Sequence, residues 1–87
     1  MASEDDMHRH HRLRAERAYA RYLELQGQID SFEERVSNSF PTNDRLAANY
    51  LKNSDEPEVW VYKVLCKHRD IQEQIIATET AMASLYR

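Results

Sequence analysis

The sequence predicts an all-α protein, an antiparallel hairpin of two helices of about 30 residues each, joined by a short connecting helix. Three observations support this fold. Apolar residues recur at alternating spacings of three and four in two long segments. The chain of 87 residues contains one glycine and two prolines, too few for the turns of a many-stranded sheet. Good helix formers such as Arg, Glu, Leu, Gln and Ala dominate the first long segment.

The first helix is expected over residues 7–37. One side of this helix carries the a and d positions of a heptad repeat, sustained over about four heptads. These positions are His8, His11, Ala15, Ala18, Tyr22, Leu25, Ile29, Phe32 and Val36. Asn38 and Pro41 end the helix, because Asn suits the turn after a helix and proline disfavours helical geometry before it. Residues 1–6 are acidic and have nothing to bury, so we expect them to be disordered.

A short helix is expected over residues 43–52, capped by Thr42 or Asn43. The last helix is expected over residues 56–86, with Pro57 in its first turn, where proline is tolerated. Its a and d positions are Val61, Val64, His68, Ile71, Ile75, Thr78, Met82 and Leu85. We expect this series to face the first helix, so that residues 7–87 form a single helical domain.

The densest apolar run of the chain, residues 59–66, lies at the start of the last helix and predicts self-association. If Val61 and Val64 face the first helix, the rest of the run leaves that helix apolar nearly all round, so it must be covered on more than one side. Aromatic anchors are also enriched in protein interfaces. The predicted oligomer interface consists of Val59, Trp60, Tyr62, Leu65 and Cys66. The hairpin is therefore expected to assemble into a dimeric or higher helical bundle, a homo-oligomer.

A basic stripe on the first helix is the predicted partner-binding surface. It consists of Arg9, His10, Arg14, Arg17, Tyr19 and Arg21. We expect it to dock on an acidic surface of another protein. Nucleic acid is the alternative partner, because arginines with interleaved tyrosines suit phosphates and bases. The formal net charge of −3 and the lack of a recognised nucleic-acid-binding module favour the protein partner.

No catalytic residues are predicted. His8, His10 and His11 invite a metal site, but they lack a cysteine partner and an HExxH motif, so we predict neither metal nor cofactor. Cys66 and His68 are two residues apart on a helix and project in different directions, which excludes a direct nucleophile–base pair. The sequence therefore predicts a non-enzymatic protein–protein interaction module, a small oligomeric adaptor, regulator or inhibitor.

The cellular location is expected to be cytoplasmic. Cys66 is the only cysteine, so no disulfide forms within the chain, and a reducing compartment is favoured. No apolar run approaches the roughly 20 residues of a membrane span. The acidic N-terminus does not have the composition of a secretory signal.

Overall fold

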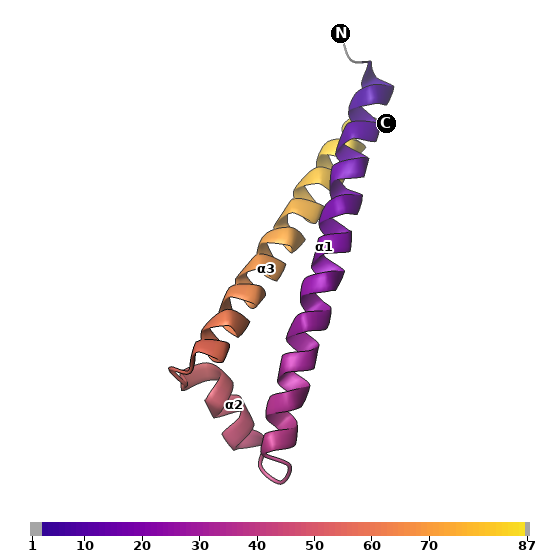
Figure 1. Ribbon diagram of the computed structural model, residues 1–87. Coiled ribbons are helices and arrows are strands. Elements are labelled where there is room, and N and C mark those ends of the chain that lie inside the picture. Colours follow the sequence, from indigo (N-terminus) through magenta and orange to yellow (C-terminus); the bar gives the residue numbers. More distant parts are fainter. Residues whose placement is uncertain (1–2, 87) are drawn as a thin grey trace.

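The computed structural model describes residues 3–86 and contains three helices, α1 (Glu4–Ser39), α2 (Asp44–Asn53) and α3 (Pro57–Ser84). α1 and α3 run antiparallel and account for most of the contacts between helices (Figure 1). They lie close together near Glu4 and Ser84 and diverge toward α2, which closes the wide end of the hairpin (Figure 1). The particle is elongated, with extents of 58 × 21 × 15 Å. The predicted all-α hairpin with a short connecting helix is confirmed.

α1 begins earlier than the sequence predicted because Ser3 caps it. The Ser3 side chain accepts a hydrogen bond from the Asp6 backbone N–H at 3.1 Å, and the Asp6 carboxylate accepts one from the Ser3 N–H at 3.3 Å. This reciprocal pair satisfies two backbone donors that the first turn otherwise leaves free. The prediction that the helix starts only at residue 7 is corrected for residues 4–6. Residues 1 and 2 lie outside the described part of the chain.

The other helix ends agree closely with their sequence signals. The Asn43 side chain caps α2 by accepting a hydrogen bond from the Leu46 N–H at 3.1 Å. Pro57 occupies the first turn of α3, where its missing N–H costs no helical hydrogen bond. α3 ends at Ser84, slightly short of the predicted residue 86.

The core follows the predicted side of α1. The buried residues of α1 all belong to its predicted a and d series, namely Ala18, Leu25, Ile29, Phe32 and Val36. At the wide end of the hairpin, Phe32 and Val36 form a cluster with Ala47 of α2 and Val59 of α3. Leu25, Ile29 and Val59 are fully buried, so these three side chains are the centre of the core.

The sequence-based prediction of which side of α3 faces α1 is wrong. Val61, Val64 and Ile71 are exposed instead of facing α1, and of the predicted series only Ile75 and Met82 are half-buried. The side that faces α1 carries a second series, Val59, Tyr62, Cys66, Arg69, Ile76, Glu79 and Ala83, whose members are buried or half-buried. Its polar members find partners on α1. The Tyr62 hydroxyl donates to Glu33 at 2.8 Å, and Arg69 donates to Gln26 at 3.3 Å.

Candidate interaction surface

The outer face of α3 presents apolar side chains that the hairpin does not cover. We call Trp60, Val61, Val64 and Ile71 the outer face; their exposed fractions are 66%, 59%, 51% and 54%. Val61, Val64 and Ile71 lie on one side of α3 at spacings of three and seven, and the polar His68 occupies the position between Val64 and Ile71. Single exposed apolar residues are common on soluble proteins, whereas a clustered stripe marks an interaction site. The outer face is therefore the main candidate for binding another protein.

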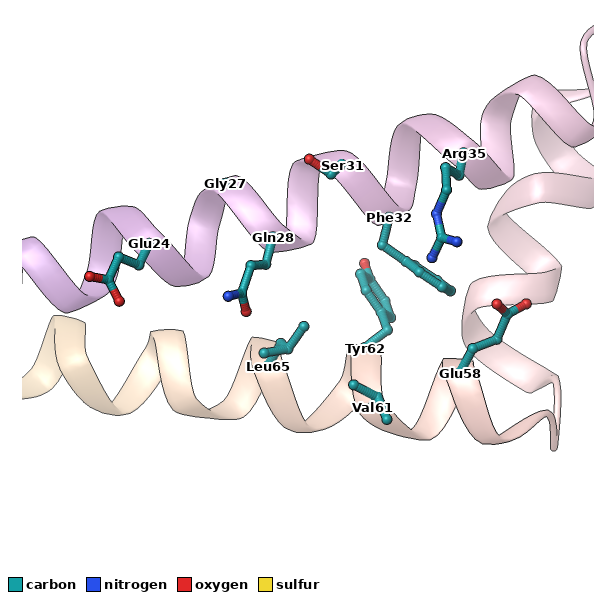
Figure 2. Close-up of a pocket in the computed structure, with 10 residues that line it drawn as sticks. All are labelled: Glu24, Gly27, Gln28, Ser31, Phe32, Arg35, Glu58, Val61, Tyr62 and Leu65. Carbon is teal, nitrogen blue, oxygen red and sulfur yellow. The ribbon is translucent and has the colours of Figure 1, made fainter.

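The residues of the predicted oligomer interface divide between the core and the surface. Trp60 is exposed, as an interface anchor must be in the free chain. Val59 is fully buried, so it is unavailable to a second molecule. Tyr62, Leu65 and Cys66 are half-buried, and Figure 2 shows Tyr62 and Leu65 directed toward α1. The reason is the rotated phase of α3, which turns part of the apolar run inward and leaves Val61 and Val64 outside.

A groove lies between α1 and α3 at the wide end of the hairpin (Figure 2). It has a volume of about 790 Å³, and its residues are Glu24, Gly27, Gln28, Ser31, Phe32, Arg35, Glu58, Val61, Tyr62 and Leu65. The Phe32 and Tyr62 rings stack in it with centroids 5.2 Å apart. The Arg35 guanidinium lies 5.1 Å from the Phe32 centroid. Val61 belongs to both surfaces, so the groove and the outer face are continuous.

Tyr62 is held in one chemical state by its surroundings. Burial and the hydrogen bond to the Glu33 carboxylate raise the pKa of the Tyr62 phenol well above its ordinary value. The hydroxyl therefore stays protonated and keeps donating to Glu33. This bond fixes the ring against Phe32, so the apolar wall of the groove is preformed.

The basic stripe of α1 is only partly free. Arg14 forms a salt bridge to Glu79 at 2.9 Å, and Arg21 forms one to Glu24 at 2.9 Å. Tyr19 is half exposed and stacks on Tyr22, with centroids 6.4 Å apart. Within residues 3–86, the remaining stripe residues, Arg9, His10 and Arg17, are exposed and form no salt bridge.

At the narrow end, a polar cluster joins α1 to α3. The Glu79 carboxylate can only accept, so His11 Nδ1–H donates to it, at 2.6 Å. His8 Nδ1–H donates to the Ala83 carbonyl at 2.8 Å, and the His11 ring stacks on Tyr86 at 5.8 Å. The hydrogen bond from His11 and the charge of Arg14 lower the pKa of Glu79, although burial opposes them. The histidines thus hold the two helices together.

The sequence did not reveal Glu79 as a partner of His11. In the predicted orientation of α3, Thr78 faces α1, and Glu79 lies next to the predicted a and d series. The only available signal was the position of Glu79, four residues before Ala83 in the more polar of the two series on α3. Partners of this kind become visible only when both helices are placed.

Metal-ligating residues do not converge anywhere in residues 3–86: no three His, Cys, Asp or Glu side chains are arranged to hold an ion. None of the three helices combines the length and apolarity needed to cross a bilayer. Cys66 is a half-buried free thiol on the side that faces α1, and His68 is exposed. No protein-family model, curated protein or solved structure matches this chain.

Proposed function

We propose that this protein is a non-enzymatic protein–protein interaction module that self-associates through the outer face of α3. The observation that carries the proposal is the outer face itself, an apolar stripe with helix-packing spacing that the hairpin leaves uncovered. A stripe of this width on a helix is normally packed against another helix. Trp60 supplies the aromatic anchor typical of interface centres. The assembled hairpins would act as a small adaptor, regulator or inhibitor.

Val64→Glu is expected to dissociate the oligomer while leaving the helical content unchanged. The new carboxylate would lie in the middle of the outer face, and burying an unpaired charge in an interface is strongly unfavourable. Light scattering would report the mass, with the variant at the monomer mass of 10.3 kDa. Ala20→Glu, which adds the same charge at an exposed position of α1, should keep the mass of the parent protein. A parent chain that stays at 10.3 kDa at every concentration would refute self-association.

A second contact surface is proposed for the exposed part of the basic stripe, with an acidic protein as its partner. Arg9 and Arg17 are exposed and form no salt bridge among residues 3–86. The loss of Arg14 and Arg21 to carboxylates lowers the number of phosphates that the stripe could neutralise. Because nucleic-acid affinity depends on neutralising many phosphates, the few free cations that remain make an acidic protein the partner that we propose.

Labelled polyglutamate and a labelled thymidine oligonucleotide would test this second surface. We expect weak binding of polyglutamate at low salt, which weakens further as salt screens the charges. The double variant Arg9→Glu, Arg17→Glu should lose it, and Arg45→Glu, an exposed change on α2, should retain it. Steeply salt-dependent binding of the oligonucleotide would instead support the nucleic-acid alternative. No binding of polyglutamate at low salt would remove the surface from the proposal.

A further inference from the structure

We propose that the groove between α1 and α3 receives the Trp60 indole of a second copy of the chain, in a parallel two-fold pair in which each copy fills the other's groove. The inference rests on the proposed self-association and names its central contact. It also assigns an occupant to the groove, which the hairpin itself leaves open.

The walls of the groove suit an aromatic occupant. Phe32 and Tyr62 present stacked rings, and Leu65 adds an aliphatic wall on the α3 side (Figure 2). The Arg35 guanidinium, which lies over the Phe32 ring, is placed to interact with the face of a further ring. The volume of about 790 Å³ lies within the range of about 300–1,000 Å³ typical of ligand pockets. An indole can therefore enter without displacing the core.

The heptad positions of α3 bring Trp60 to this groove. With Val61 at an a position and Val64 at d, Trp60 takes a g position and Leu65 takes the following e position. In a parallel pair, a g residue of one helix contacts the following e residue of the other. Trp60 of one copy therefore meets Leu65 of the other, at the lip of its groove. In an antiparallel pair, g residues face g residues instead, and the indole lies away from the groove.

One polar residue of α3 favours the parallel arrangement. His68 lies at the a position that follows Val61, and it would pair with its own copy and fix the alignment, as a single polar a residue does in parallel dimers. His68 is exposed in the free hairpin, so it is available for this contact.

The apolar area of the outer face alone is smaller than a stable dimer interface requires, so the groove must contribute. From their exposed fractions, Val61, Val64 and Ile71 offer together roughly 150 Å² per copy. Trp60 adds roughly 130 Å². Two copies would bury about 850 Å² in total if apolar atoms make up about 65% of the interface, against about 1,200 Å² for a stable specific complex. Insertion of the indole against Phe32, Tyr62 and Leu65 supplies additional area.

Parallel pairing also predicts an unusual response to salt. Residues 22–58, at the wide end, carry eight carboxylates against three cationic side chains. A parallel pair places two such ends side by side, so screening by salt should strengthen association. An antiparallel pair separates the two wide ends and does not share this response.

The test uses Gln28, which lies over the groove opposite Leu65 (Figure 2). Gln28→Phe would fill the groove from within its own chain, so the dimer dissociation constant should rise about tenfold or more. Gln28→Ala removes the same amide without filling the groove and should leave the constant unchanged within about twofold. Circular dichroism would verify that both variants keep the helical content of the parent chain.

Trp60 is the only tryptophan, so its fluorescence reports the same contact in the unmodified chain. Emission should shift to the red on dilution, in step with the fall in mass measured by light scattering. A parent chain that dimerises while Trp60 emission stays constant would overturn the groove proposal, as would a Gln28→Phe variant that dimerises like the parent. Either result would leave self-association through the outer face intact. A monomer at all concentrations would instead refute self-association itself.

Discussion

Replacing Ile29 with alanine is expected to destabilise the hairpin by about 2–5 kcal/mol, the usual cost of truncating a fully buried Ile or Leu. Ile29 is fully buried between α1 and the rest of the hairpin, well inside the ends of α1. A chain of this size has a total stability of about 4–13 kcal/mol, so one substitution removes a large part of it. The melting temperature followed by circular dichroism should fall by about 4–8 °C per kcal/mol. A fall of only a few degrees would contradict the observed core.

Two valines of α3 provide the matched control, because they carry the same chemistry on opposite sides of the helix. Val59 is fully buried, so Val59→Ala should cost about 1.5–3 kcal/mol. Val64 is half exposed, so Val64→Ala should change the stability of the monomer by less than about 0.5 kcal/mol. The comparison requires dilute protein, since Val64 is also proposed to stabilise the dimer. A larger effect at Val64 than at Val59 would restore the phase that the sequence predicted.

The fold was predictable where one apolar series dominates a helix. α1 has a single such series, and its buried residues Leu25, Ile29 and Phe32 all belong to it. The helix ends also followed local chemistry: Asn43 caps α2, and Pro57 lies in the first turn of α3. These features depend on residues a few positions apart, which a sequence displays directly.

The phase of α3 was not predictable because two series compete. The more apolar one, through Val61, Val64 and Ile71, lies outside, and the inward one includes Tyr62, Arg69 and Glu79. Periodicity alone favours the more apolar series. The inward series prevails where its polar groups meet partners on α1, such as Glu33 for Tyr62 and His11 for Glu79. Hydrophobic periodicity indicates both series of α3 but does not distinguish the series that packs against α1 from the series that is exposed.

This exchange of faces changes the interpretation of the apolar run at residues 59–66. Val59 and Tyr62, predicted to meet a partner, pack within the hairpin, and Val61 and Val64, predicted to be internal, are exposed. Trp60 is exposed on either phase, because it lies between the two series. Trp60 therefore remains in the proposed self-association surface, and Val61 and Val64 replace Val59 and Tyr62 beside it.

Acid is expected to weaken the narrow end of the hairpin through Glu79. The hydrogen bond from His11 and the charge of Arg14 hold the pKa of Glu79 below its ordinary value of 4.5. A carboxyl group whose pKa is lower in the folded state stabilises the fold fully above its unfolded-state pKa. This contribution is lost as the pH falls below about 4.5 and through the lower folded-state pKa. Protonated Glu79 no longer carries the charge that attracts Arg14 and strengthens the hydrogen bond from His11, so the two helices should separate first at this end.

Glu79→Gln tests this contribution, since glutamine keeps the shape of the side chain but has no charge to lose. The variant should melt below the parent chain at neutral pH, and the difference should shrink as the pH falls below about 4.5. Glu16→Gln is the control, because Glu16 pairs with Arg12 on the exposed side of α1 and such pairs contribute little. Its melting temperature should follow that of the parent at every pH. A Glu79→Gln difference that does not shrink at all as the pH falls below 4.5 would show that the carboxylate charge does not hold this end together.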